Sequence, residues 1–260
     1  MANADWNALD RYVPPSQRHY CAFLDILGYK EKSRKFFAGQ YNLSERINRA
    51  YENAFGTMNL TSHFYDTSGI KTRFFSDSIV ITADAKENSE DELFGVVQFC
   101  SLLATFLSYE DLFVRGGISS GTYSERNVAE HSFISSVGLE KAYYLESQVA
   151  KNPRIMFDDH LYDELSTEGK NYIVKEKGEM VLHFARSFIS TNLNHNDIYK
   201  EMVDVFRSRE AEPDARARDK YTWVLDYYYW SVTSIPGLDL GRFKPFWSGQ
   251  DRGFSLIDQY

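Results

Sequence analysis

The sequence predicts an α+β fold, in which a mixed β-sheet carries helices on one face and is followed by C-terminal helices. Short apolar, β-prone runs alternate along the chain with segments whose apolar residues recur at helical spacing. Their order is β-α-ββ-α-β-β-α-β, which is typical of mixed sheets with helices packed against them. With 260 residues, 43% of them hydrophobic, the chain is long enough to bury one substantial core.

The first strands and helices have the clearest signals. Residues 20–28 form a continuous apolar run, typical of a central strand, and residues 29–60 are rich in helix. Within them, Asn42-Leu43-Ser44-Glu45 is a helix start signal. Residues 70–83 predict two strands joined by a tight turn near Ser76-Asp77.

The later elements are shorter. A long apolar helix over residues 93–107 precedes a strand over 112–124, whose glycines predict a bend or the close approach of another backbone. The other expected elements are β-structure at 132–137, a helix at 140–150, a strand at 155–157, a short helix at 160–165, a hairpin over 172–175 and 180–188, and helices at 195–210 and 216–232. The tail from residue 235 is rich in Gly and Pro.

These elements divide the chain into three parts. Residues 1–17 are polar, include two consecutive prolines and predict an N-terminal arm. Residues 18–190 hold the predicted sheet and its helices. Residues 191–260 predict a helical C-terminal extension.

Composition excludes several classes of protein. A net charge of −8 argues against a broad nucleic-acid-binding surface. The two cysteines, Cys21 and Cys100, lie in apolar segments and predict buried thiols rather than a disulfide. The first residues lack a basic region and an apolar core, so no signal peptide is expected, and no segment approaches the ~20 apolar residues of a membrane span. We therefore expect a soluble cytoplasmic protein without a membrane partner.

Two aspartates lie in settings that are unfavourable for a carboxylate. Asp25 interrupts an apolar run that ends at Gly28, and Asp77 interrupts the run over 74–81. A buried carboxylate is costly unless a cation or hydrogen-bond donors meet it. Alone, Asp25 is well explained as a satisfied core group and Asp77 as a turn former. Together, in matching settings, they predict an oxygen-only site for Mg²⁺ or Mn²⁺. The histidines show no metal-ligand spacing, and no nucleophilic triad or GxxxxGK loop is present.

Several motifs resemble one family in the right order over residues ~20–185. The segment Phe23–Tyr29 resembles the first-strand signature of class III nucleotide cyclases, and the Ser76-Asp77 turn falls where that family has a second metal aspartate. The matching later segments are Arg115–Gly121, Val137-Gly138, Ala142–Glu146 and Val174–Glu179. The chain looks most like the bacterial pyrimidine cyclases of Pycsar antiphage defence. The resemblance implies a class III cyclase-like, ferredoxin-like fold, with residues 18–190 as the catalytic domain.

The resemblance also implies roles for individual residues. Asp25 and Asp77 would be catalytic and would hold two divalent cations, Mg²⁺ or Mn²⁺, with the Ile26 carbonyl as a further metal ligand. The substrate-binding residues would be Leu27, Gly28 and Tyr29, through backbone N–H groups at a strand-to-helix turn, together with Arg73, Ser135 and Lys175. Lys175 would bind the triphosphate, although an exposed hairpin lysine explains it equally well.

Departures from the family pattern bear on the substrate. Arg73 and Ser135 occupy the base-reading positions and match neither the adenylate nor the guanylate cyclase pairs. Arginine donates well to carbonyl oxygens, and a serine accepts from an N–H, which favours uracil and leaves cytosine open. The structural alternatives are that Arg73 is an exposed strand residue and that Ser135 is an ordinary strand residue.

A second departure concerns the transition state. The ribose asparagine and the transition-state arginine of the family are replaced by Glu140 and Tyr144. Losing such a donor costs about 3–4 kcal/mol of transition-state stabilisation. Arg115 and Arg154 are candidate replacements; a salt bridge for Arg115 and a solvated position for Arg154 are the structural alternatives.

The resemblance thus implies a homodimer that converts UTP into 3′,5′-cyclic UMP and pyrophosphate, as a second messenger for a separate effector that is not bound directly. Three alternatives remain open: a cytidylate cyclase that uses CTP, a degenerate cyclase that binds nucleotides without turnover, and a metal-dependent nucleotidyltransferase or phosphohydrolase on a related palm-like fold.

Overall fold

A computed structural model describes residues 17–61, 69–86, 90–128, 131–187, 214–234 and 248–257. The predicted arm, apart from Gln17, and the predicted helix at 195–210 lie outside the described residues. The elements are β1 (Gln17–Ile26), α2 (Tyr29–Phe37), α3 (Leu43–Thr61), β2 (Lys71–Phe75), β3 (Ser78–Asp84), α4 (Glu90–Tyr109), β4 (Val114–Val128), β5 (His131–Ser136), α5 (Val137–Tyr144), the π-helix η2 (Leu145–Val149), β6 (Ile155–Phe157), the 3₁₀-helix η3 (Asp159–Glu164), α6 (Thr167–Lys170), β7 (Ile173–Glu176), β8 (Glu179–Leu182), α9 (Ala215–Thr233) and β9 (Phe254–Leu256).

The described strands form one mixed sheet in the order β2-β3-β1-β4-β6-β8-β7-β9, and β5 pairs with β4. In its first half, β1-α3-β2-β3-α4-β4, the strands are antiparallel and β1 lies between β3 and β4. This βαββαβ arrangement is the ferredoxin-like topology. The parallel pair of β4 and β6 makes the whole sheet mixed, so the predicted α+β class is confirmed.

The two long helices cover one face of the sheet, as predicted. Alternate residues of β1, namely Ala22, Leu24 and Ile26, are buried in one core cluster with residues of α3 and α4. Asn42 begins α3 as its sequence predicts, since its side-chain carbonyl accepts the Glu45 N–H.

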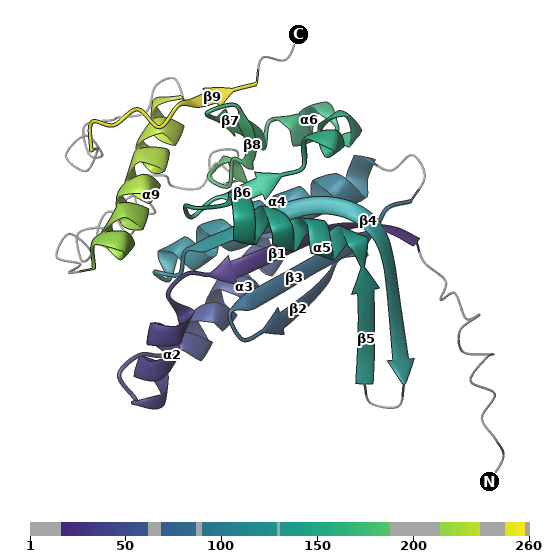
Figure 1. The fold of residues 1–260 in the computed structure, drawn as a ribbon, viewed down its shortest axis with the longest axis horizontal. Helices are drawn as coiled ribbons and strands as arrows, with labels where there is room; N and C mark the ends of the chain where they lie inside the picture. Colours follow the sequence, from purple (N-terminus) through teal and green to yellow (C-terminus); the bar gives the residue numbers. More distant parts are fainter. Residues whose placement is uncertain are drawn as a thin grey trace.

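The shorter helix α5 lies on the opposite face of the sheet, in front of β1 and β4 in Figure 1. Phe23, which alternates with the core residues of β1, contacts the Tyr143 ring of α5 at 5.2 Å between centroids. The predicted close backbone approach explains the glycines of β4. A Cβ on Gly117 would lie 2.3 Å from the Ala142 carbonyl oxygen, and one on Gly121 would lie 2.6 Å from the Gly138 nitrogen.

The far part of β4 continues beyond the sheet as a curved ribbon with β5 (Figure 1). On the other side, β9 pairs with β7 although the sequence predicted only a Gly/Pro-rich tail there. Helix α9 packs on the main core through Trp223, Tyr227 and Tyr228, which are nearly inaccessible to solvent. The described part of the predicted C-terminal extension therefore shares the core of the sheet.

One expectation about hydropathy is wrong. Helix α4 includes Asp91–Tyr109, a stretch of mean hydropathy 1.4 that is long and apolar enough to cross a membrane. Its most apolar window is 89% buried inside the protein, where it forms the centre of the core against the sheet.

Candidate metal and nucleotide site

The end of β1 places Asp25 on the face of the sheet that carries α5. Asp25 is opposite Ser78 of β3 and Arg115 of β4 in the strand register. Its side chain is 21% exposed, and the Arg115 Nε lies 3.3 Å from its Oδ2. The sequence predicted that a carboxylate in this apolar strand is costly, and Arg115 on the neighbouring strand offsets that cost by pairing with Asp25.

The turn between β2 and β3 brings the second aspartate to the same place. Ser76 adopts a left-handed conformation with φ 59°, and the Asp77 carbonyl accepts the Ile26 N–H at 2.8 Å. Burial raises the pKa of the Asp25 carboxyl; Arg115 opposes this rise, and the neighbouring Asp77 charge adds to it. The two predicted aspartates are therefore close enough to repel each other.

A third carboxylate, Glu146, joins this group and was not predicted as a site residue. It lies in the π-helix η2 that continues α5, and only 2% of it is exposed. Its Oε1 is 2.5 Å from the Arg115 Nε. Burial raises the pKa of Glu146, Arg115 opposes the rise, and Asp25 and Asp77 add to it. A glutamate in register with the apolar residues of the predicted helix 140–150 was the signal that could have found it.

The residues present fit a divalent cation. Asp25, Asp77 and Glu146 are three carboxylates, whereas the cations that act on Asp25 are Arg115 and, more weakly, Lys220. Carboxylate oxygens suit Mg²⁺ or Mn²⁺. In the part of the chain that the structure describes, no three His, Cys, Asp or Glu residues form a ready-made metal cage. Mg²⁺ sites commonly use one or two carboxylates and complete the shell with water and substrate phosphates. Asp25 and Asp77 are such a pair.

The turn after β1 supplies backbone donors beside these carboxylates. Gly28 has φ +72° and precedes the first residue of α2, and its carbonyl accepts N–H groups from the first turn of that helix. The N–H groups of Gly28 and Tyr29 thus lie at a helix N-terminus, which favours anions. The Leu27 N–H instead donates to the Phe113 carbonyl at 2.8 Å, so the predicted phosphate cradle narrows to Gly28 and Tyr29.

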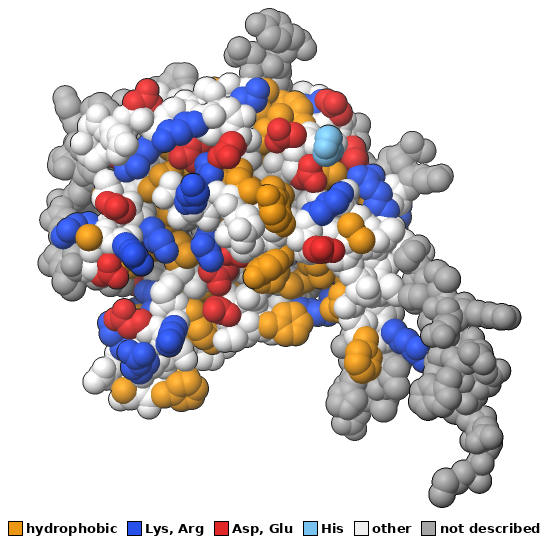
Figure 2. Space-filling model, viewed as in Figure 1, with side chains coloured by type: hydrophobic (Ala, Val, Ile, Leu, Met, Phe, Trp, Pro, Cys, Tyr) orange, Lys and Arg blue, Asp and Glu red, His pale blue; other side chains and the backbone are white. Residues whose placement is uncertain are grey.

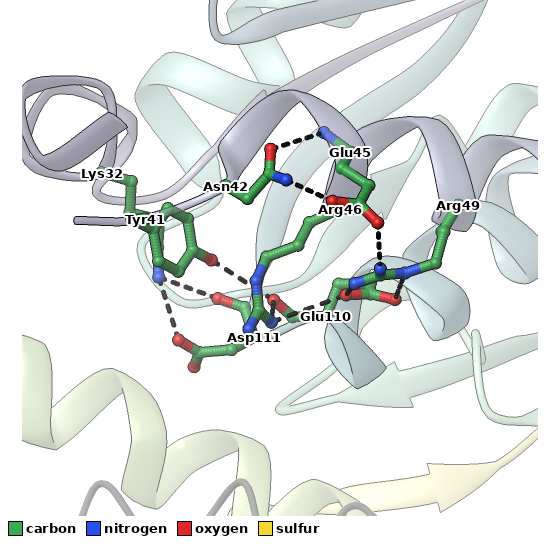
Figure 3. Close-up of polar contacts among 8 residues, drawn as sticks. All are labelled: Lys32, Tyr41, Asn42, Glu45, Arg46, Arg49, Glu110 and Asp111. Carbon is green, nitrogen blue, oxygen red and sulfur yellow. Dashed lines mark hydrogen bonds and ion pairs between the residues drawn. The ribbon is translucent and has the colours of Figure 1, made fainter. Parts of the chain in front are cut away.

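A polar cluster helps to hold α2 in place (Figure 3), together with Tyr29 and Phe36, which pack against the core. None of the residues of α2 is buried. Lys32 binds the carboxylate of Asp111 at 3.1 Å and its carbonyl at 2.9 Å, at the turn before β4. The Tyr41 ring lies between the cations of Lys32 and Arg46, 5.4 and 5.0 Å from its centroid. Arg46 in turn donates to the Glu110 carbonyl at 3.0 Å, which ties α2 and α3 to the same turn.

The predicted base-reading residues are not brought together. Arg73 lies on β2, and its Nη2 pairs with Glu125 Oε1 of β4 at 2.5 Å. Ser135 is exposed on β5 opposite Ser124, and strand alternation turns it away from the face that its neighbours Ile134 and Ser136 share. No motif pointed to Glu125 as the partner of Arg73.

Two other predicted cations lie away from Asp25. Lys175 is on β7, which three strands, β4, β6 and β8, separate from β1. Arg154 is buried, and it binds Glu176 at 2.8 Å and Glu179 at 2.7 Å. Because Arg154 is buried, the expectation of a solvated position is wrong. Its role as a replacement for the transition-state arginine stays a prediction. Arg115 forms ion pairs with Asp25 and Glu146, so it has the salt bridge that the sequence offered as the structural alternative to a transition-state role.

A hydrophobic surface lies next to the carboxylates on the α5 face. It includes the exposed side chains of Phe75 and Tyr143. Figure 2 shows hydrophobic side chains gathered near the middle of this face. A shallow cavity of about 490 Å³ there is lined by Phe23, Phe75, Ser78, Val80, Ile134, Ser136, Leu139, Glu140 and Tyr143.

Comparison with known proteins gives similar structures and no sequence relatives. No protein-family model matches the chain, and no curated protein matches it. The adenylyl cyclase CyaB from P. aeruginosa is 14% identical with a TM-score of 0.45, over 66% of this chain and 95% of that one. The guanylate cyclase domain of RhGC from Catenaria anguillulae, solved with GTP, is 14% identical with a TM-score of 0.45, over 64% and 95% of the two chains.

A dimeric guanylyl cyclase domain of the RhoGC fusion protein from Blastocladiella emersonii is 12% identical with a TM-score of 0.45, over 65% of this chain and 96% of that one. Identities and TM-scores this low assign neither a family nor an activity to the chain. The α+β class therefore rests on the topology of the sheet itself.

Proposed function

We propose that the protein is a nucleotide cyclase of the class III type, which converts UTP into 3′,5′-cyclic UMP and pyrophosphate. The observation that carries this proposal is the meeting of Asp25 and Asp77 directly before the N-terminus of α2. Paired carboxylates beside free helix N–H groups suit a metal-bound triphosphate.

The site residues would divide metal binding, phosphate binding and charge stabilisation among them. Asp25 and Asp77, with the Ile26 carbonyl, would hold two divalent cations, which when bound favour ionisation of the ribose 3′-hydroxyl and neutralise the leaving pyrophosphate. The N–H groups of Gly28 and Tyr29 bind phosphate oxygens. The 3′-oxygen forms a bond to the α-phosphorus in line with the bond to pyrophosphate, which breaks. Arg115, whose guanidinium lies between Asp25 and Glu146, would offset the charge that develops.

The site is completed by a second copy of the chain. Lys175 lies too many strands from Asp25 to serve the same site, and the hydrophobic surface beside Asp25 is suited to a partner subunit. In a twofold dimer, Lys175 of one subunit binds the phosphates held by Asp25 and Asp77 of the other, which yields two equivalent sites.

Uracil recognition rests on Arg73. Its guanidinium donates to carbonyl oxygens, and Glu125, its partner in the structure, is a ready acceptor for the uracil N3–H in the place expected of Ser135. CTP is the alternative substrate because cytosine also offers acceptors to Arg73. A role for the product as a second messenger in antiphage defence rests on the motif resemblance alone.

The direct test is incubation of the full chain with each of the four nucleoside triphosphates and Mn²⁺, followed by mass spectrometry. We expect cyclic UMP and pyrophosphate, and at least a hundredfold loss in Asp25→Ala and Asp77→Ala, by analogy with removal of one transition-state-stabilising group. Asp163→Ala, at an exposed carboxylate, is the matched control. If no triphosphate is turned over, the result would favour a degenerate cyclase. Glu140 and Tyr144, at the positions of the ribose asparagine and the transition-state arginine, support that alternative.

The shared site has its own test. Mixing Asp77→Ala subunits with Lys175→Ala subunits should restore activity, because each heterodimer keeps one intact site. Failure of this complementation, with both variants folded and dimeric by light scattering, would refute the two-subunit site while leaving cyclase activity itself open.

A further inference from the structure

The Arg115 guanidinium lies between two carboxylates that differ in exposure and in hydrogen bonding. Its Nε–H donates to Asp25 Oδ2 at 3.3 Å, which is long for a hydrogen bond between charged groups. Glu146 Oε1 lies closer to the same Nε, at 2.5 Å, yet this contact is not aligned as a hydrogen bond. The two carboxylates therefore compete for one cation, and the nearer one is paired by charge alone.

The state of Glu146 needs an explanation. A carboxylate oxygen that is buried and lacks a donor is unfavourable, and native proteins keep few of them. Glu146 cannot turn to water, since only 2% of it is exposed. The Arg115 side chain, by contrast, is 30% exposed and has room to change its direction.

We propose that Glu146 is the positioning residue for Arg115, and that it accepts the Arg115 Nε–H when a divalent cation binds to Asp25. This rests on the metal site of the proposed function. A divalent cation and a guanidinium repel each other, so they cannot both occupy the exposed side of Asp25. Glu146 already lies within hydrogen-bond distance, so a small reorientation of the Arg115 side chain completes the exchange.

The helix that carries Glu146 is held firmly enough for this role. Gly117 of β4 lets the α5 backbone approach so closely that a Cβ there would lie 2.3 Å from the Ala142 carbonyl oxygen and 2.5 Å from the Leu145 Cβ. The first turn of α5 is capped by Ser136, whose Oγ accepts the Leu139 N–H at 3.1 Å. Arg115 is thus the mobile partner, and Glu146 is the fixed one.

Without the negative charge of Glu146, the guanidinium of Arg115 pairs with the Asp25 carboxylate, and it then competes with the metal. We expect Glu146→Gln to weaken Mn²⁺ binding to the full chain by about tenfold, the lower end of the effect of residues that orient metal ligands. Isothermal titration with Mn²⁺ alone measures this without any turnover. Glu52→Gln, at an exposed carboxylate of α3, is the matched control and should not change the affinity.

A double-mutant comparison separates positioning from simple structural damage. In an Arg115→Ala background there is no guanidinium to displace, so Glu146→Gln should no longer weaken Mn²⁺ binding. An equal loss in both backgrounds would overturn the proposal, as would unchanged binding in Glu146→Gln or no Mn²⁺ binding by the wild-type chain.

The wild-type chain provides a second measurement in case the variants fold poorly. Titration with Mg²⁺ can be followed by the Arg115 Nε–H signal in ¹⁵N NMR, assigned through its loss in Arg115→Lys. We expect the signal to shift and its exchange with water to slow as the buried Glu146 becomes the acceptor. A signal that does not respond, or one lost to faster exchange, would contradict the proposal.

These outcomes are distinct from those of the cyclase test. Mn²⁺ binding that depends on Glu146, in a protein that turns over no nucleotide, would support the inference and refute the cyclase. If the protein forms cyclic nucleotide but its Mn²⁺ affinity does not depend on Glu146, the cyclase proposal would be supported and the inference about Glu146 refuted.

Discussion

Two arginines of this protein each lie between two carboxylates, and their surroundings differ. Arg154 binds Glu176 and Glu179 at 2.8 and 2.7 Å and donates to the Val149 carbonyl at 3.1 Å, while the second Glu176 oxygen accepts the Trp223 indole N–H. In that cluster only the Arg154 Nε lacks a partner. Arg115 has one long hydrogen bond to Asp25 and a close but unaligned neighbour in Glu146.

These surroundings indicate a structural role for the Arg154 cluster and an open position for a ligand in the Arg115 cluster. Arg154 and Glu176 form a buried pair whose donors and acceptors are nearly matched and which α9 covers, while Glu179 is about half exposed. Around Arg115 the negative charge is in excess because Asp77 adds to Asp25 and Glu146. An excess of carboxylate at a half-exposed position predicts a cation site, whereas a balanced buried pair does not.

The largest effect on stability should follow from breaking the balanced cluster. Arg154→Met leaves Glu176 buried without its cation, and we expect the free energy of unfolding to fall by about 3–5 kcal/mol. Urea unfolding measures this change, with Lys151→Met at an exposed position as the control. A loss below about 1 kcal/mol, the range of surface pairs, would show that the two clusters do not differ as described.

Acid should affect His183 and the carboxylates around Arg115 in opposite directions. Burial lowers the pKa of His183 to about 3, with Arg186 adding to the effect, so His183 stays neutral in the folded protein beside the Tyr227 hydroxyl. Its contribution to stability is present above its ordinary pKa of about 6.5 and is lost as the pH falls below it. Asp25 and Glu146 have raised pKa values, so their contributions are present at low pH and are lost as the pH rises through those values.

This contrast can be measured with one variant. Between pH 6.5 and 4.5 the wild type should lose about 1.4 kcal/mol per pH unit relative to His183→Gln, because unfolding then takes up one proton at this residue. Parallel pH profiles for the two proteins would show that His183 does not titrate on unfolding.

The smallest expected effect concerns the cap of the helix that carries Glu146. Ser136→Ala removes the acceptor of the Leu139 N–H and should cost about 1 kcal/mol of stability. Thermal unfolding measures it, with Ser147→Ala farther along the same helical segment as the control. If Glu146 depends on this helix for its position, Mn²⁺ affinity should fall together with stability in Ser136→Ala only.

The sequence predicted most of the first half of the sheet correctly. Asn42 as a helix start, Ser76-Asp77 as a turn and the glycines of β4 as close contacts all follow from backbone chemistry that acts within a few residues. The pairing of Asp25 with Asp77 was also predictable, since each aspartate interrupts an apolar strand at a cost that only a partner offsets.

Partners distant in sequence could not be predicted in the same way. Arg73 was matched with Ser135 by motif position, but in the folded chain it pairs with Glu125, 52 residues away. The strand β9 lies in a segment that the sequence shows only as a Gly/Pro-rich tail, because its β-structure depends on the edge that β7 offers.

Periodicity and turn chemistry are local properties, so the amino-acid sequence was enough to predict the order of the elements, the two aspartates and the turn that follows each strand. The folded structure was needed to show that Glu146 faces Arg115, that Arg154 belongs to the core and that three strands separate Lys175 from the strand of Asp25. The physical reason is that a charged side chain takes whichever partner the packing of sheet and helices brings within a few ångströms, and that choice is made across the fold rather than along the chain.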